Sequence, residues 1–335
     1  MSILSVITSI LLLMTIPADC TNFSPKTRRN RSLKMYQADD KFSPILADYD
    51  MIDSYIYPPV LQWSLGNNLI SSFPTDKAMK GIMGGKGANL ERMTAIGLNV
   101  PPGFTVTTEV CASFQASGKL LTGNVWSKIL VELQSLETKF GREYGDVKNP
   151  LLLSVRSGAA ISMPGMMDTV LNLGITDDTI PGLSKQFGRR FALDSYRRLL
   201  NMFGEVVLGI PYADFERELA DMKKLVQVTS DSQLSAEDLD LLVIKYKDVY
   251  RKHGKEFPQN PITQLFMSVT AVFNSWDSDR CRKYREVEKI TDILGTAIPY
   301  FFTFPIFPKN INLHFPWKIF RNCCKHSGNG IWKYG

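Results

Sequence analysis

The pattern of apolar and polar residues divides the chain into parts of different character. Residues 21–54 are polar and keep no sustained period, which is typical of a linker or a disordered arm. From Tyr55 onward apolar residues recur at helical or strand spacing, and after about Pro299 aromatic residues and prolines crowd together with neither period. The pattern therefore predicts three parts, residues 1–54, 55–296 and 297–335.

Two stretches of the middle part predict strands that end abruptly. The run PLLLSVRSG predicts a buried strand over Leu151 to Val155, which carries Arg156 at its C-terminal end before a Ser-Gly pair interrupts it. The run FTVTTEVC begins with strand-like alternation and then enters a helix, with Thr107 or Thr108 as its cap.

Helical spacing marks the segments between and after these strands. In KGANLERMTAIG, the apolar residues Leu90, Met93 and Ile96 share one face, and Gly97 suits a left-handed cap. In RRFALDSYRRLLNMFGEVV, an apolar seam faces away from a charged half of the helical wheel. The seam consists of Tyr196, Leu200, Phe203 and Val207, and the charged half of Arg190, Asp194, Arg197 and Arg198.

Three further segments predict scaffold helices. DFERELADMKKLV is amphipathic, and SAEDLDLLVIKYKDVYRKHG opens with the capping-box pattern Ser235 to Asp238. ITQLFMSVTAVFNSWDS places four apolar residues on one core-facing side. These are Leu265, Val269, Val272 and Trp276.

Composition narrows the class of protein. The 335 residues are 44% apolar, so the chain can bury a substantial core as one large domain or two lobes. The net charge of +6 comes from lysines and arginines scattered along the chain, without a basic stripe interleaved with aromatic residues. We therefore expect no nucleic acid as a partner, and the modest positive charge fits an anionic small molecule equally well.

Cysteines and histidines give little sign of chemistry. The five cysteines are odd in number and form no pair with metal-ligand spacing, which favours a reducing compartment and predicts no metal site of this kind. None of the three histidines, His253, His314 and His326, lies in a glycine-rich or acidic setting that would indicate catalysis.

The N-terminus leaves two interpretations open. Residues Ile3 to Ile16 are mostly apolar and uncharged, and a basic, serine-containing stretch follows them. The pattern is typical of a cleaved targeting segment, but an apolar helix or an imprecisely assigned start site would give the same pattern. The apolar run is too short to predict a stable membrane span.

Glycines surround one lysine in GGKGANLERM. Gly84, Gly85 and Gly87 would let the backbone approach an anion near Lys86, and a helix that starts near Ala88 would point its N-terminal amides at the same spot. The sequence is not a Walker A motif, because Gly and not Ser or Thr follows the lysine. A phosphate site and a structural turn therefore remain alternatives.

Arg156 and the loop SMPGMMDT give two further hints. An arginine at the end of an apolar strand suits phosphate oxygens, although it could equally pair with an acidic surface group. The three methionines of the loop, beside Gly165, could line a slot for a purine or simply pack in the core. Asp168 and Thr169 could then reach phosphate or a metal. Arg198 has the pattern of a solvated face.

Five stretches together resemble the N-terminal nucleotide-binding domain of the pyruvate, phosphate dikinase family. They occur in the order and with the spacing that the family has. The stretches are Gly84 to Met93, Val100 to Cys111, Leu151 to Gly174, Phe191 to Gly204 and Ala271 to Arg285. The related pyruvate, water dikinases (phosphoenolpyruvate synthases) share the glycine-lysine and strand-arginine elements but lack the methionine-rich form of the loop.

The resemblance implies an α+β fold, an ATP-grasp-like nucleotide-binding domain with a helical insertion. It implies that Lys86, Arg156 and Arg198 grip the ATP phosphates, and that the loop with Gly165, Asp168 and Thr169 closes over them. The family interconverts ATP, phosphate and pyruvate with AMP, diphosphate and phosphoenolpyruvate, using magnesium and a phosphohistidine. A homodimer and a cytoplasmic or plastid-like organellar location are implied in the same way.

The resemblance stops within ITDILGTAIPY, so we expect the domain to be incomplete at its C-terminal lobe. Residues 297–335 contain no Asp or Glu to ligate magnesium, and the carrier histidine's sequence context is absent. We therefore expect no catalytic histidine, no metal ligands and no activity of this chain alone. The alternatives are a non-catalytic degenerate nucleotide-binding module or partner protein, and a fragment of a pyruvate, water dikinase.

Overall fold

The computed structural model describes residues 46–47, 55–63, 69–98, 100–291 and 293–302. All of them belong to the larger of the two units into which the chain divides, residues 38–335. The expected targeting segment, most of the expected linker and residues 303–335 lie outside the described residues. Within the described part of the chain, no helix combines the length and the apolar character that a membrane crossing needs.

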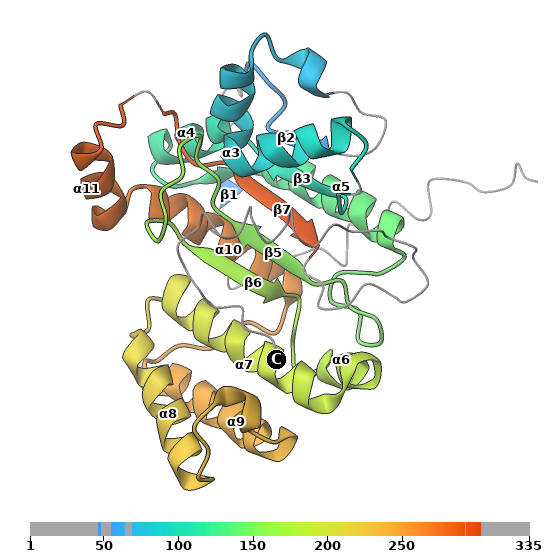
Figure 1. The fold of residues 1–335 in the computed structure, drawn as a ribbon, viewed down its shortest axis with the longest axis vertical. Helices are drawn as coiled ribbons and strands as arrows, with labels where there is room; N and C mark the ends of the chain where they lie inside the picture. The colour runs from blue at the N-terminus through green and yellow to red at the C-terminus, as the bar shows by residue number, and fades with distance from the viewer. Residues whose placement is uncertain (1–45, 48–54, 64–68, 99, 292, 303–335) are drawn as a thin grey trace, which may run out of the picture. The chain divides into compact units, whose positions relative to one another are not determined.

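A five-stranded sheet is the framework of this unit (Figure 1). Its order is β2-β3-β7-β5-β6, and every neighbouring pair is antiparallel. The strands are β2 (Val60–Trp63), β3 (Gly103–Val106), β7 (Ile298–Phe302), β5 (Leu153–Arg156) and β6 (Thr169–Leu173). A separate parallel pair joins β1 (Leu46–Ala47) to β4 (Leu121–Thr122). Helices mixed with an antiparallel sheet confirm the expected α+β class.

Strand β7 occupies the middle of the sheet, although the sequence pattern assigns its residues to the tail. Tyr300 pairs with Phe104 of β3 on one side and with Val155 of β5 on the other. Its side chain is fully buried, and its ring stacks on that of Phe104 with centroids 4.6 Å apart. The sheet therefore extends past the boundary expected at residue 296 and reaches Phe302.

Helix α3 (Asp76–Ala95) covers β2, β3 and β7 and contains the glycine-flanked lysine. The Thr75 side chain caps its start by accepting a hydrogen bond from the backbone N–H of Ala78. At Gly84 the backbone leaves helical geometry, with φ 67° and ψ 168°, so two helical segments meet at a kink. The expectation of a helix start near Ala88 is thus wrong, because the second segment resumes directly after Gly84 and includes Lys86.

The buried face of the second segment also differs from the predicted one. Ile96 is 74% exposed, while Leu90 and Met93 are only half-buried. The segment buries a face of small and polar residues, which the apolar pattern does not mark. That face consists of Gly87, Ala88, Glu91 and Thr94. At the C-terminal end Gly97 has a φ of 79°, as expected for a left-handed cap.

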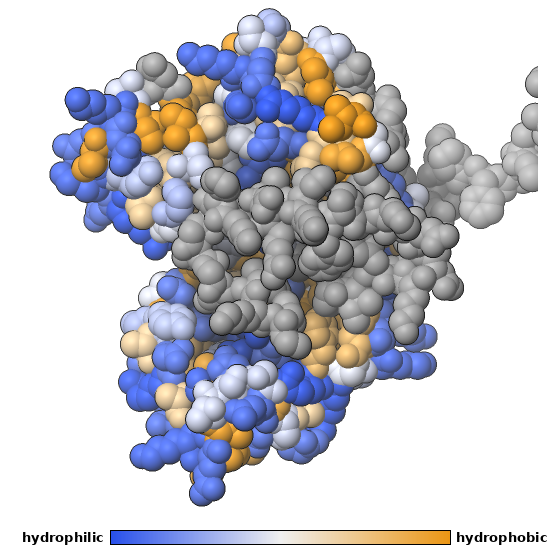
Figure 2. All heavy atoms as spheres, in the orientation of Figure 1, coloured by the Kyte–Doolittle hydropathy of each residue, from blue (hydrophilic) through white to orange (hydrophobic). Residues whose placement is uncertain are grey.

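Four helices follow β6 as the expected helical insertion (Figure 1). They are α6 (Ile180–Phe187), α7 (Arg189–Val206), α8 (Tyr212–Leu225) and α9 (Ala236–Lys252). Helix α7 contacts each of the other three and also β6. The Ser235–Asp238 capping box is present at the start of α9, as predicted. Hydrophilic residues predominate over α8 on the face that Figure 2 shows.

The predicted seam and charged half of α7 are only partly right. Tyr196, Leu200 and Phe203 are buried as expected. Arg197, predicted for the solvent-facing half, is buried instead. It ion-pairs with Asp194 at 2.7 Å and with Asp231 of the 3₁₀ turn η4 (Asp231–Gln233) at 3.3 Å. The helical wheel misses this because the turn before α9 covers that side of α7.

The remaining helices pack around the sheet. The N-cap of α4 (Thr108–Ala116) is Thr107, one of the two predicted caps. Helix α10 (Pro261–Trp276) packs on β5 and β6, and all four residues of its predicted core face are buried. Helix α5 (Gly123–Phe140) contacts β2 and β3, and α11 (Asp279–Val287) follows α10.

Candidate functional site

Lys86 reaches the turn that follows β5. Its Nζ donates a hydrogen bond to the backbone carbonyl of Ser157 at 2.7 Å, across 71 positions of sequence. Ser157 directly follows Arg156, so the lysine and the predicted strand-end arginine meet at one place. The lysine side chain stays exposed while Arg156 is half-buried. Lys86 is therefore held at the end of the strand that carries Arg156.

The glycines beside Lys86 make room for the protein's own backbone. A Cβ atom on Gly84 would lie 1.6 Å from the carbonyl oxygen of Gly158, and the Gly84 φ of 67° also disfavours other residues. The backbone N–H of Gly85 donates to the carbonyl of Ala159 at 2.9 Å. A Cβ atom on Gly87 would come within 2.8 Å of Thr105 Oγ1. Close backbone packing thus explains Gly84 and contact with the Thr105 side chain explains Gly87, whereas a Cβ atom on Gly85 would make only an ordinary contact of 3.4 Å with the Ala159 carbonyl oxygen.

The residues just before β7 also contact the turn that follows β5. The backbone N–H of Gly158 donates to the Ala297 carbonyl at 2.8 Å and to Thr296 Oγ1 at 3.0 Å. The Ala297 N–H returns a hydrogen bond to the Gly158 carbonyl at 3.2 Å. The turn after β5 therefore links the kink of α3 to the start of the central strand.

The methionine-rich loop begins at the turn that follows β5 and ends opposite Arg156. Thr169, the first residue of β6, is the register partner of Arg156. Gly165 has a φ of 74°, and nothing lies within 4 Å of a Cβ built there, so this part of the loop is open. Of the three methionines, Met163 is buried, whereas Met166 and Met167 are half-buried. The open loop tip thus lies on a partly buried base.

Asp168 is fixed by groups from outside the loop. Its carboxylate forms an ion pair with Arg280 of α11, and its backbone N–H donates to Ser275 Oγ of α10 at 3.4 Å. Sequence reasoning assigns no role to Arg280 or Ser275. The only signal was their position in AVFNSWDSDRCRKYR, one of the five stretches that carry the resemblance.

Arg198 lies on α7, and its partner lies on the same helix. Its Nε donates to Asp194 Oδ2 at 3.0 Å, one turn earlier on the same helix. Among the described residues no hydrogen bond or ion pair joins Arg198 to the other predicted site residues. The structure therefore brings Lys86, Arg156, Asp168 and Thr169 into one connected region and leaves Arg198 paired on its helix.

The described residues do not fit a magnesium site built from the protein alone. No group of three or more Asp, Glu, His or Cys residues among them is arranged to hold a metal ion. Asp168, the one predicted carboxylate, is engaged by Arg280. Magnesium prefers oxygen ligands in near-octahedral geometry, and one engaged carboxylate does not supply them.

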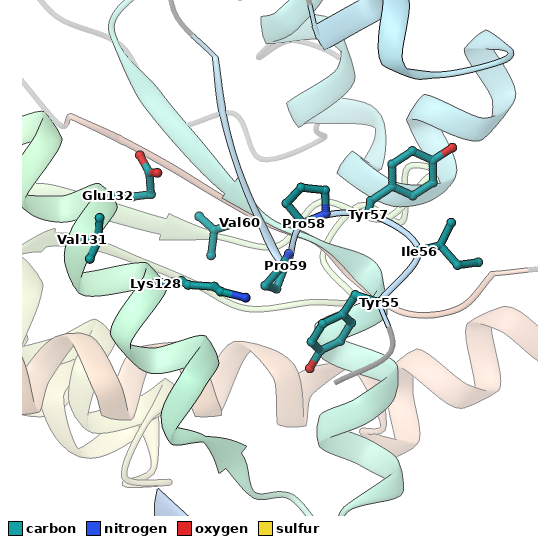
Figure 3. Close-up of a pocket in the computed structure, with 9 residues that line it drawn as sticks. All are labelled: Tyr55, Ile56, Tyr57, Pro58, Pro59, Val60, Lys128, Val131 and Glu132. Atoms are coloured by element: carbon teal, nitrogen blue, oxygen red, sulfur yellow. The ribbon is translucent and has the colours of Figure 1, made fainter. Parts of the chain in front are cut away.

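A separate pocket of about 550 Å³ lies between the start of β2 and α5 (Figure 3). One wall is the segment from Tyr55 to Val60, and the other consists of Lys128, Val131 and Glu132. Burial raises the pKa of Glu132, and the nearby charge of Lys139 offsets this only in part. None of the residues predicted to bind ATP lines this pocket.

Comparison with known proteins identifies a family that the chain matches. The family described as the pyruvate phosphate dikinase AMP/ATP-binding domain matches residues 80–129 and 117–298. Pyruvate, phosphate dikinase 1, chloroplastic, of Oryza sativa subsp. japonica is 55% identical over 224 residues, which are 67% of this chain and 24% of that protein. The corresponding enzyme of Arabidopsis thaliana is 54% identical, with coverage of 67% and 23%.

A third relative extends the comparison. Pyruvate, phosphate dikinase 2 of Zea mays is 52% identical over the same length, with coverage of 67% and 25%. This chain therefore spans about a quarter of the length of the curated relatives that it matches. The matched residues include Lys86, Arg156, the methionine-rich loop and the first residue of β7.

Proposed function

This chain belongs to the pyruvate phosphate dikinase AMP/ATP-binding domain family, and from that premise we propose that it binds ATP where α3, β5 and β6 meet. One observation carries the assignment: Lys86 Nζ is hydrogen-bonded to the residue that directly follows Arg156. Lys86 thus reaches, from a distant part of the sequence, the residue next to Arg156 at a strand end, beside a loop with an open tip.

The chemistry of a triphosphate fits these groups. Lysine and arginine neutralise phosphate charge, and arginine can donate two parallel hydrogen bonds to phosphate oxygens. Lys86 would exchange its bond to the Ser157 carbonyl for a phosphate oxygen. The Gly165 region of the loop would close over the phosphates, with Thr169 opposite Arg156. Arg198 would join them only after a change of partner, since Asp194 now holds it.

We further propose that the chain supplies the nucleotide-binding step of phosphoryl transfer in a pyruvate, phosphate dikinase. Such groups position the phosphates and neutralise their charge rather than react covalently. The matches to pyruvate, phosphate dikinases favour this over a pyruvate, water dikinase. The ATP-grasp-like arrangement, the incomplete C-terminal lobe and the homodimer remain predictions.

We infer the domain organisation and the cellular location of this chain from its family membership. We propose that the nucleotide-binding domain begins near Tyr55 and includes β7, since that strand pairs on both sides. Relatives from Oryza sativa and Arabidopsis thaliana are named chloroplastic. We therefore propose a plastid location with a targeting segment inside residues 1–54.

Calorimetric titration of ATP into the purified chain tests the site. We expect Lys86→Ala and Arg156→Ala each to weaken ATP binding by roughly tenfold or more, because each removes a charge-assisted hydrogen bond worth about 1.5–3 kcal/mol. Lys128→Ala, in the separate pocket, is the matched control and should bind ATP as the parent does. Unchanged affinity in both site variants would remove these residues from the site.

A further inference from the structure

The base of the methionine-rich loop is held at two points by one corner of the fold. We define the α10–α11 corner as residues 275–285, where the end of α10 turns into α11. Ser275 Oγ accepts a hydrogen bond from the backbone N–H of Asp168 at 3.4 Å, and Arg280 forms an ion pair with the Asp168 carboxylate. Asp168 and Arg280 lie 112 positions apart in the sequence.

Contacts within the α10–α11 corner hold its two helices together, so the corner can act as a fixed support for the loop. The guanidinium of Arg285 lies over the Trp276 ring, 4.0 Å from its centroid, and its Nη1 donates to the Trp276 carbonyl at 2.6 Å. The Ser278 hydroxyl donates to the carbonyl of Ser275 at 2.8 Å and its oxygen caps α11. These contacts tie both ends of α11 to the end of α10, on the helix from which Arg280 reaches the loop.

Arg280 also balances the negative charge at this place. Glu205, near the end of α7, has a pKa raised by burial and by the charge of Asp168, and lowered by the charge of Arg280. Arg280 is ion-paired with Asp168, and its charge also acts on Glu205. Without that guanidinium, the Asp168 carboxylate would stand uncompensated next to Thr169, where the proposed triphosphate approaches.

We propose that Arg280 is a positioning residue of the nucleotide site. It anchors the base of the loop through Asp168, and it neutralises the Asp168 carboxylate, which would otherwise repel ATP. This rests on the proposed function for its nucleotide part, whereas the anchoring of the loop does not depend on it. Asp168 is in this view an anchor of the loop rather than a ligand of phosphate or metal.

Two measurements on the purified 335-residue chain test the anchor, namely hydrogen exchange in peptides that cover residues 163–168 and calorimetric titration of ATP. We expect Arg280→Gln to speed exchange in the loop and to weaken ATP binding about two- to fivefold, the range for an ion pair with exposed partners. Arg280→Lys keeps the charge and should recover most of both properties. Arg282→Gln is the control, because Arg282 pairs with Asp277 and Asp279 and not with the loop.

A double variant separates anchoring from a general structural effect. Once Asp168→Asn has removed the partner, adding Arg280→Gln should change loop exchange little further. Equal exchange and affinity in Arg280→Gln and Arg282→Gln would overturn the proposal, and faster exchange with unchanged ATP affinity would overturn its nucleotide part. If the parent chain binds no ATP, the proposed function fails, while the exchange data still decide whether Arg280 anchors the loop.

Discussion

Gly84 lies so close to Gly158 that a Cβ atom at position 84 would come within 1.6 Å of the Gly158 carbonyl oxygen. The contact joins the kink of α3 to the turn after β5, and both predicted phosphate-binding cations lie next to it. Gly85 strengthens the same contact through its hydrogen bond to Ala159. The position of Lys86 relative to Arg156 therefore depends on the absence of a side chain at Gly84.

Gly84→Ala should destabilise the fold by roughly 2–5 kcal/mol, because a positive φ and a backbone overlap both oppose the added methyl group. Gly81→Ala is a matched control on the same helix, since nothing lies within 4 Å of a Cβ there. That variant should be more stable by about 0.5–1 kcal/mol, the usual gain of alanine over glycine in a helix. Urea unfolding measures both, and similar effects at the two positions would contradict the contact.

Tyr300 tests whether β7 belongs to the core. Tyr300→Ala should cost about 3–5 kcal/mol, because it removes a fully buried ring that stacks on Phe104. Tyr300→Phe should be neutral or stabilising, since the Tyr300 hydroxyl is buried without a hydrogen-bond partner among the described residues. Urea unfolding of both variants is the measurement. A small loss in Tyr300→Ala would mean that β7 does not hold the sheet together.

Local pattern predicted the elements whose signals are continuous in sequence. The strand before Arg156, the core face of α10 and the Ser235 capping box are all present. It failed for the segment of α3 after Gly84, because the buried face there consists of small and polar residues. It also failed for β7, because a strand buried between two neighbours shows no polar alternation, and its pairing with β3 and β5 is long-range.

The candidate site shows the same limit. Sequence alone singled out Lys86 and Arg156 one at a time, and the family resemblance supplied the reason to join them. Arg280 could not be found in this way, because its partner Asp168 lies 112 positions away and its own helix pattern is that of a charged surface. Contacts between segments that are distant in sequence depend on how the chain packs. Neither the spacing of apolar residues nor a local sequence motif predicts them.

Arg197 and Arg198 should differ sharply in their effect on stability. Arg197 is buried, and although burial lowers its pKa, the charge of Asp194 raises it so that the net shift is upward. Arg197→Ala should cost about 3–5 kcal/mol, as expected when a buried ion pair loses one partner. Arg198→Ala should cost less than about 1 kcal/mol, because its side chain is 45% exposed.

Urea unfolding and ATP titration of the same two variants separate support from binding. If Arg198 contacts ATP, as the family resemblance implies, Arg198→Ala should weaken ATP binding while the free energy of unfolding barely changes. Equal losses of stability in the two variants would contradict the different environments of the two arginines.

Glu91 should make stability depend on pH in a defined direction. Its side chain is fully buried in α3, and Oε1 accepts a hydrogen bond from the Leu69 N–H at 3.1 Å. Burial raises its pKa, and hydrogen bonds from the Leu69 and Ile70 backbone offset this only in part. The folded state therefore binds this proton more tightly than the unfolded state does. The resulting stabilisation is complete below the unfolded pKa of about 4.3 and is lost as pH rises through the raised folded pKa.

The comparison with Glu91→Gln isolates this effect, because other titrating groups are common to both proteins and cancel in the difference. Free energies of unfolding are measured by urea titration from pH 4 to pH 8. Whatever the offset between the two proteins at pH 4, the difference should move in favour of Glu91→Gln as pH rises. A difference that stays constant across this range would show that the Glu91 pKa is not raised on folding.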